Sequence, residues 1–294
     1  MIYTLTLNPS LDYLLEVPEI RIGETNRSTY ESLHFGGKGI NVSYVLKQLG
    51  NESICLGFTA GFTGKELEDE LDKEGLKHDF VFVGSGNTRI NVKLNSGVIT
   101  EVNASGPAIS EGDVDALFEK LSVFSENDTL VLAGSTPKGH DDIYKRIMEK
   151  LSKTGVRFVI DTSGKKLVDA LKYKPFLIKP NKAELEEIEG AHLETDKEIV
   201  AAAKKLKSLG AINVLVSMGE NGALLLDEND KIHKAQPIKI TPVSTVGAGD
   251  SMVAGFLSGV ENGYEYALKL ANICGAATAM SEILADKEQI EKLM

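Results

Sequence analysis

Continuous apolar runs alternate with amphipathic runs along most of the chain. The apolar runs have the length of buried strands, and the amphipathic runs have the period of helices. Strands that are apolar on both faces occur in parallel sheets covered by helices. The pattern therefore predicts an α/β fold with a doubly wound, mostly parallel sheet, helices on both faces, and two closing helices that begin near residues 250 and 264. The apolar runs are IYTLTL, TLVLAG, VRFVID, FLIKP and NVLVSMG.

Two segments break this alternation. Residues 88–102 contain two strand-like runs around the turn NSG, which is typical of a hairpin. Residues 11–35 favour strands over helices. We predict that the segments of about 11–35 and 87–104 form a small β-sheet apart from the main sheet, which serves as a lid over a site, as a dimer surface, or as both. No Pro-rich or Ser-rich linker divides the chain, so residues 1–294 are predicted to form a single domain.

The composition argues against several classes of protein. The chain carries 43 acidic and 32 basic residues, and its net charge of −11 disfavours broad binding to nucleic acid or to membranes. No apolar stretch has membrane-spanning length, and the N-terminus lacks the features of a signal peptide. Cys55 and Cys274 stand in apolar settings, which predicts buried free thiols and a cytoplasmic protein. Neither the cysteines nor the five histidines show metal-ligand spacing.

Polar and glycine residues gather where the predicted strands end. In doubly wound sheets, ligands bind beyond the carboxyl ends of the strands. These strand exits therefore predict one crevice that is assembled from several loops. The exit segments are TLNPSLD, AGSTP, DTSG, KPNKAE and SMGENG.

The segment TVGAGDSMVAGF, residues 245–256, places two glycines and a carboxylate at the start of a predicted helix. Glycines let backbone N–H groups approach an anion, and the helix N-terminus adds unpaired N–H groups and the positive end of its dipole. We interpret the loop as a phosphate-holding element in which Asp250 accepts a proton from an attacking hydroxyl. The alternative is that Asp250 is an ordinary helix N-cap.

A second glycine-rich segment, HFGGKGINVSYVLKQLG, opens another predicted helix at residues 34–50. It is not a Walker A motif, because Gly39 rather than Ser or Thr follows Lys38. Its glycines allow a ligand to approach closely, Lys38 offers positive charge, and Asn41 can bond hydroxyl groups. The alternative is a glycine-rich turn with a solvated lysine.

Together, GGKGINV and VGAGDSMVAGF resemble the pair of signatures of the phosphofructokinase B family of ribokinase-like sugar kinases. Further segments match in the same order from residue 1 to about residue 280, and they are similar to the branch of 1-phosphofructokinases and tagatose-6-phosphate kinases. The resemblance implies a ribokinase-like fold, ATP and Mg²⁺ as cofactors, and a sugar phosphate as acceptor. The further segments are TLNPSLD, GFTG, TRINVK, LAGSTPKG, IDTSG and LIKPNKAEL.

The resemblance also implies roles for single residues. Asp250 matches the catalytic base, and Gly247, Ala248 and Gly249 match the anion hole. Among the matches to sugar-binding residues, an arginine of TRINVK would grip the phosphate that the sugar already carries, and an arginine of ETNR would assist, from the same subunit or from a neighbouring one. Without the resemblance, a capping turn and a solvated strand arginine are the alternatives. The sugar-binding matches are Asp12, Arg27, Gly37, Lys38, Asn41, Arg89 and Asn103.

A third group of residues matches the nucleotide side of the family's site. Within it, Glu184 is implied as a magnesium ligand that acts through water, since Mg²⁺ prefers few carboxylates together with water and phosphate oxygens. On charge alone, Glu184 is not distinguishable from the other glutamates of the same acidic helix face. For Asn272, a polar position in a helix–helix contact is the alternative. The nucleotide-side matches are Lys179, Asn181, Ser217, Gly219, Gly222 and Asn272.

The expected function is ATP-dependent phosphorylation of D-fructose 1-phosphate to fructose 1,6-bisphosphate, with tagatose 6-phosphate as the alternative acceptor. TRINVK and Lys38 within GGKG favour the first. An alternative of another class is a non-catalytic sugar-phosphate or nucleotide-binding regulator on the same fold, although the intact GAGD argues against it. The expected ligands are small molecules, with a homodimer through the β lid as the expected assembly. Thr136, Ser244 and Thr245 depart from the residues that are common in the family.

Overall fold

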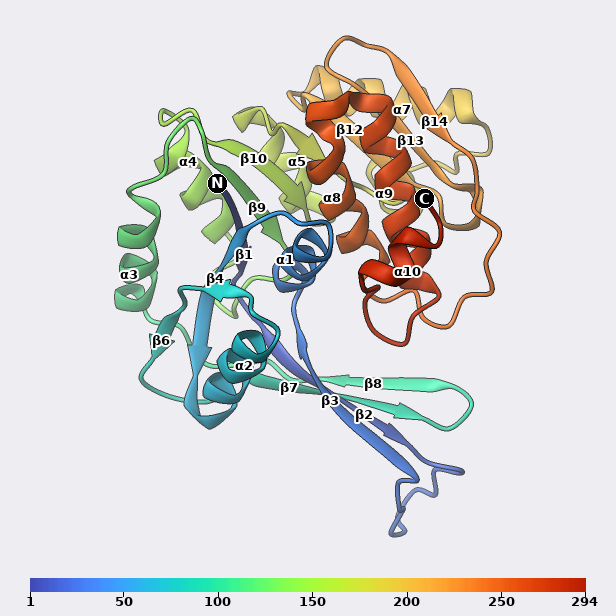
Figure 1. Cartoon of the computed structure of the whole chain (residues 1–294). Helices are drawn as coiled ribbons and strands as arrows, with labels where there is room; N and C mark the ends of the chain where they lie inside the picture. Colours follow the sequence, from blue (N-terminus) through green and yellow to red (C-terminus); the bar gives the residue numbers. More distant parts are fainter.

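The computed structural model describes residues 1–294, and it contains a large sheet with helices on both faces and a separate small sheet that projects from one end (Figure 1). The α/β fold, the mostly parallel main sheet and the separate small sheet predicted from the sequence are confirmed. In spatial order, the main sheet contains β14 (Ile232–Ala235), β13 (Ala223–Leu226), β12 (Asn213–Ser217), β11 (Leu177–Ile178), β10 (Arg157–Asp161), β9 (Thr129–Ala133), β1 (Ile2–Thr6), β4 (Ser53–Ala60) and β5 (Lys77–His78), with β6 (Val81–Val83) also paired to β4.

One edge of the main sheet is antiparallel, and the sequence analysis named no strands for it after residue 219. Pairs from β12 to β5 are parallel, whereas β12, β13 and β14 pair antiparallel. The physical reason is the length of the connection. Only a short turn around residues 219–221 separates β12 from β13, and a parallel pair needs a crossover of a dozen or more residues.

Each face of the main sheet has its own apolar core. Side chains alternate along a strand, so Leu130 and Leu132 of β9 pack in one cluster and Val131 packs in the other. Helices α3 to α7 cover the first face, and α1, α8, α9 and α10 cover the second (Figure 1). The helices are α1 (Lys38–Gln48), α2 (Gly61–Lys73), α3 (Glu111–Leu121), α4 (Ile143–Leu151), α5 (Gly164–Ala170), α6 (Lys182–Glu189), α7 (Asp196–Ser208), α8 (Ala248–Gly259), α9 (Tyr264–Ala279) and α10 (Lys287–Glu291).

The two late helices, α8 and α9, begin close to the predicted positions and pack tightly against each other. A Cβ at Gly255 would lie 2.7 Å from the carbonyl oxygen of Leu270, so the close approach of the backbones requires glycine there. Cys55 and Cys274 are buried free thiols, as predicted. No helix combines the length and the apolar character that crossing a membrane requires.

The small sheet grows directly out of the main fold. Its strands, in spatial order, are β3 (Tyr30–Gly36), β2 (Ser10–Glu16), β7 (Arg89–Asn95) and β8 (Ile99–Asn103). β7 and β8 form the predicted antiparallel hairpin. β2 follows β1 after three residues, and β3 leads almost directly into α1, so the sheet is rooted beside the carboxyl end of β1 (Figure 1).

Candidate active site

A cavity of about 1320 Å³ lies at the carboxyl ends of the main-sheet strands. Thr6, Gly134, Lys179 and Ser217 line it, and each stands at or just after the end of a different strand. Residues of the small sheet and of the first turn of α8 also line it. The strand exits therefore meet in one crevice, as expected for a doubly wound sheet.

All but one of the residues implied by the resemblance line this cavity, although their roles stay predictions. The exception is Arg27, which lies exposed in the connection between β2 and β3. The residues that line the cavity are Asp12, Gly37, Lys38, Asn41, Arg89, Asn103, Lys179, Asn181, Glu184, Ser217, Gly219, Gly222, Gly247, Ala248, Gly249, Asp250 and Asn272.

The glycine loop before α8 leaves backbone N–H groups free. Gly247 is the N-cap with φ 77°, and a Cβ there would lie 2.5 Å from Leu284 Cδ2. The amides of Gly247, Gly249 and Asp250 have no acceptor within the chain, whereas the Ala248 amide donates to the Thr245 carbonyl oxygen at 3.3 Å. Three unpaired amides at the N-terminus of a 12-residue helix form a site suited to an anion.

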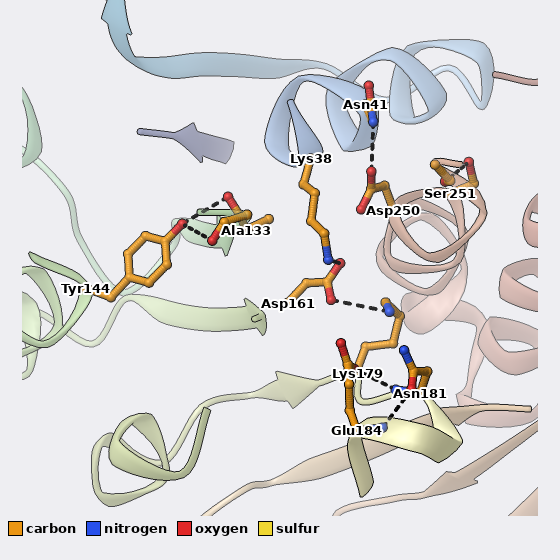
Figure 2. Close-up of polar contacts among 12 residues, drawn as sticks. Lys38, Asn41, Ala133, Tyr144, Asp161, Lys179, Asn181, Glu184, Asp250 and Ser251 are labelled. Atoms are coloured by element: carbon orange, nitrogen blue, oxygen red, sulfur yellow. Dashed lines mark hydrogen bonds and ion pairs between the residues drawn. The ribbon is translucent and has the colours of Figure 1, made fainter. Parts of the chain in front are cut away.

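Asp250 is the third residue of α8 and makes no capping hydrogen bond. The alternative that it is an ordinary N-cap is therefore wrong, because Gly247 occupies that position. Its buried carboxylate instead accepts a hydrogen bond from Asn41 Nδ2 at 2.8 Å (Figure 2). Asn41 belongs to α1, so the second glycine segment positions the carboxylate of the first.

The glycines on either side of Lys38 are also required by packing against Thr6. The amide of Ile40 donates to Thr6 Oγ1 at 3.1 Å, so the end of β1 supplies the acceptor that the N-terminus of α1 lacks. A Cβ at Gly37 would lie 2.5 Å from Thr6 Cγ2, and one at Gly39 would lie 2.6 Å from Thr6 Oγ1. Side chains at these two positions would displace Thr6.

Asp161, at the end of β10, is a central residue that the sequence reasoning missed. Its carboxylate lies 3.4 Å from Lys38 Nζ and 3.3 Å from Lys179 Nζ (Figure 2). The two lysines predicted to contact sugar and nucleotide thus share one buried counter-ion. The available signal was a single carboxylate at the exit of an apolar strand, in IDTSG.

The two buried carboxylates titrate in opposite directions. Burial raises the pKa of Asp250 to about 7, and the negative charge of Asp161 adds to this. Burial acts to raise the pKa of Asp161 also, but Lys179 and Lys38 outweigh it and hold that pKa below its ordinary value. Asp161 therefore stays ionised while Asp250 is poised to exchange a proton near neutral pH.

The carboxylate of Asp12 lies at the small-sheet end of the cavity, among residues that were not predicted. Its Oδ1 accepts hydrogen bonds from Ser10 Oγ at 2.8 Å and from Asn91 Nδ2 at 2.9 Å. Its Oδ2 lies 3.0 Å from Lys93 Nζ. Arg89, on the same strand as Asn91 and Lys93, donates its Nε to the Asn8 carbonyl oxygen at 3.1 Å. Period-two spacing along TRINVK was the signal for Asn91 and Lys93.

On the opposite side of the cavity, Asn181 and Glu184 form a capping box at the start of α6. The Glu184 amide donates to Asn181 Oδ1 at 2.8 Å, and the Asn181 amide donates to Glu184 Oε2 at 2.9 Å (Figure 2). Asn272 Nδ2 donates to the Gln236 carbonyl oxygen at 2.9 Å. No group of three or more His, Cys, Asp or Glu residues that could hold a metal is present.

Replacing Asp250 with Asn should stabilise the fold increasingly as the pH rises from about 4 to about 7. Between the ordinary value of 3.8 and about 7, the folded protein keeps a proton on Asp250 that the unfolded chain has released. Asp250 therefore lowers the free energy of unfolding by about 1.4 kcal/mol per pH unit in this window, and the variant lacks this contribution. Urea unfolding of both proteins across the window measures the difference, and a constant difference would contradict the raised pKa.

Comparison with known proteins shows the family to which this chain belongs. The model of the pfkB family of carbohydrate kinases matches residues 6–287. A 1-phosphofructokinase of Bacillus subtilis is 44% identical over 100% of this chain and 97% of its own. A D-tagatose-1-phosphate kinase of Bacillus licheniformis is 37% identical over 99% and 97% of the two chains. The crystal structure of Escherichia coli phosphofructokinase-2 in complex with substrates and products has a TM-score of 0.92 and 31% identity over 99% and 97% of the two chains. The family expected from the sequence is thus confirmed: the chain belongs to the pfkB family of carbohydrate kinases, and it is an ATP-dependent kinase.

Proposed function

We propose that this chain transfers the terminal phosphoryl group of ATP to the 6-hydroxyl of D-fructose 1-phosphate, giving fructose 1,6-bisphosphate and ADP. The observation that carries the proposal is the buried Asp250 carboxylate beside three unpaired amides in a cavity whose other end is the polar face of the small sheet. The names of the relatives that are 41–44% identical over the whole chain support fructose 1-phosphate as the acceptor.

Asp250 acts as the general base in this proposal. As the O6–P bond forms and the bond from phosphorus to the ADP oxygen breaks, the proton of the hydroxyl passes to the Asp250 carboxylate. In this proposal, the amides of Gly247, Gly249 and Asp250, which have no acceptor in the chain, bind the oxygens of the migrating group and stabilise their charge. Asn41 holds the carboxylate in place throughout.

Lys38 and Lys179 are the proposed partners of the phosphate oxygens of ATP and of the migrating group, because both ammonium groups line the cavity beside Asp161. Burial acts to lower the pKa of Lys38, but Asp161, Asp250 and Glu184 outweigh it and hold the pKa above its ordinary value. Lys38 therefore stays charged in the cavity. Asp161 forms ion pairs with both lysines and so holds their ammonium groups in position. Because its pKa is held below the ordinary value, Asp161 stays ionised and does not take part in proton transfer.

Glu184 is the proposed ligand for Mg²⁺, through water. One oxygen of its carboxylate closes the capping box, the other accepts no hydrogen bond within the chain, and the residue lines the cavity. A single carboxylate oxygen beside bound phosphates fits an ion that keeps most of its water. When bound, Mg²⁺ neutralises charge on the ATP phosphates.

The position of the phosphate that the sugar already carries does not distinguish between two candidate ketohexoses. The relative from Bacillus licheniformis is named for tagatose 1-phosphate, whereas the sequence led us to consider tagatose 6-phosphate. Fructose 1-phosphate and tagatose 1-phosphate differ only in configuration at C4, and both leave the 6-hydroxyl free. Tagatose 1-phosphate is therefore the second candidate acceptor.

The small sheet is proposed as a lid that excludes water and as the surface of a homodimer. The face of the small sheet that points away from the cavity carries Val102, an apolar side chain that is 59% exposed and therefore available to a partner subunit. Arg27 is exposed in the connection between β2 and β3 and does not line the cavity of its own chain. A partner would bring its Arg27 toward the sugar end of the cavity in a two-fold assembly.

Replacing Asp250 with Asn should lower kcat by about 10²–10⁴-fold, because general-base catalysis contributes this much, while ATP still binds. Coupled ADP release is measured with fructose 1-phosphate, tagatose 1-phosphate, tagatose 6-phosphate and fructose 6-phosphate. We expect the wild-type kcat/KM to be highest for fructose 1-phosphate. Binding without turnover of any of the four sugars would refute the proposal and favour a non-catalytic regulator.

Replacing Glu184 with Gln should raise the Mg²⁺ concentration needed for half-maximal activity by about tenfold or more. Gln also serves at the third position of a capping box, so the free energy of unfolding should change by less than about 0.5 kcal/mol. The matched control is E198Q, which makes the same change in the Thr195–Glu198 capping box of α7, away from the cavity. An identical Mg²⁺ requirement in E184Q and E198Q would contradict the assignment.

Replacing Arg27 with Ala should lower kcat/KM by about tenfold without changing the dimer seen by analytical ultracentrifugation. Mixing R27A with D250N should restore activity, since the D250N subunit lends its Arg27 to the intact Asp250 site of its partner. Arg21, exposed in the same connection and paired with Glu19, provides the control variant R21A. A monomer, or mixtures no more active than their components, would exclude action across the dimer.

A further inference from the structure

One face of the small sheet is a continuous polar surface that lines the cavity. Because side chains alternate along strands, Asp12 of β2 and Asn91 and Lys93 of β7 share this face. Asp12 stands directly opposite Asn91 in the parallel pair, and Lys93 stands opposite Glu101 of β8. Lys93 forms its ion pair with Asp12 rather than with its cross-strand neighbour Glu101.

The two oxygens of Asp12 are held in different ways. Oδ1 accepts from the buried side chains of Ser10 and Asn91, which belong to the sheet and are fixed by it. Oδ2 is paired with Lys93, whose ammonium sits on a flexible four-carbon stem with a 19% exposed side chain. A lysine side chain reorients at little cost in free energy. A ligand can therefore draw the Lys93 ammonium away from Oδ2, which leaves this oxygen free to accept a hydrogen bond.

The other cations of this region have partners that are not proposed sugar ligands. Lys38 and Lys179 both pair with Asp161. Arg89 uses its Nε and one terminal nitrogen on the carbonyl oxygens of Asn8 and Ala104. Lys93 differs from them, because its partner Asp12 is itself proposed to bind a sugar hydroxyl.

We propose that Lys93 is a specificity-determining residue that exchanges partners when the substrate binds. Its ammonium leaves Asp12 and pairs with the phosphate that the sugar already carries, and the vacated Asp12 Oδ2 accepts a sugar hydroxyl. This inference rests on the proposed function, and it deepens it by naming the group that selects phosphorylated over free ketoses.

The exchange leaves every group with a partner, since the ammonium pairs with the phosphate and the Asp12 carboxylate still accepts from Ser10 and Asn91 and now also from the sugar hydroxyl. A phosphate dianion attracts the ammonium more strongly than a single carboxylate does, and Asp12 gains a hydroxyl donor in return. A free ketose offers hydroxyls but no anion, so Lys93 stays on Asp12 and competes with the sugar for Oδ2. The pair thus makes hydroxyl recognition conditional on the phosphate.

The test compares how K93M, K93R and wild type bind a phosphorylated and a free sugar. KM for fructose 1-phosphate and the inhibition constant of D-fructose as a competitive inhibitor are measured at saturating ATP. In K93M, we expect KM for fructose 1-phosphate to rise about tenfold or more, while D-fructose binds as well as to wild type or better, because Oδ2 is free. K93R should recover part of the lost affinity, and KM for ATP should not change.

The control is K77M, because Lys77 pairs with Glu52 at the same distance of 3.0 Å but lies on β5, outside the cavity. If Lys93 merely holds Asp12 in place, K93M weakens both sugars by the same factor, and this result would overturn the inference. Unchanged KM for fructose 1-phosphate in K93M would overturn it too. A wild-type enzyme that turns over no ketohexose phosphate would instead refute the proposed function itself, and the inference with it.

Discussion

Two carboxylates buried in one cavity are the constraint on which the rest of the site depends. Asp161 and Asp250 cannot both be ionised without compensation, because burial and mutual repulsion disfavour the second charge. The chain resolves this by giving two lysines to Asp161 and none to Asp250. One carboxylate becomes a permanent counter-ion, and the other becomes a group that gains and loses a proton near neutral pH.

The fold brings these groups together from distant parts of the chain. Asp161 belongs to β10 and Asp250 to α8, and Lys38 and Asn41 both belong to α1 (Figure 2). Each of these residues lies at the end of a strand or in the first turn of a helix, where backbone N–H and C=O groups have the fewest hydrogen-bond partners within the chain. The main sheet and the tightly packed pair α8–α9 hold the carboxylates in position, whereas the opposite end of the cavity is built on the four-stranded small sheet that projects from the body (Figure 1).

The fold was largely predictable from the sequence, because apolar runs and glycine loops leave strong periodic signals. The antiparallel edge was missed because it depends on the length of one connection, β12 to β13. Asp250 was found because it stands in a glycine-rich helix start. Asp161 was not, since a single aspartate after an apolar strand has no local pattern, and its importance comes from two lysines that only the fold places beside it.

The contact between Thr6 and the start of α1 bears on how such sequences should be interpreted. The side chain of Thr6 at the end of β1 leaves no room for a Cβ at Gly37 or Gly39. These two positions therefore require glycine whether or not a ligand binds in the cavity. A descendant that had lost catalysis would still need those glycines to fold. The glycine signature around Lys38 is therefore a marker of the fold, while the proposed catalysis depends on the acid pair at the end of β10 and in the first turn of α8.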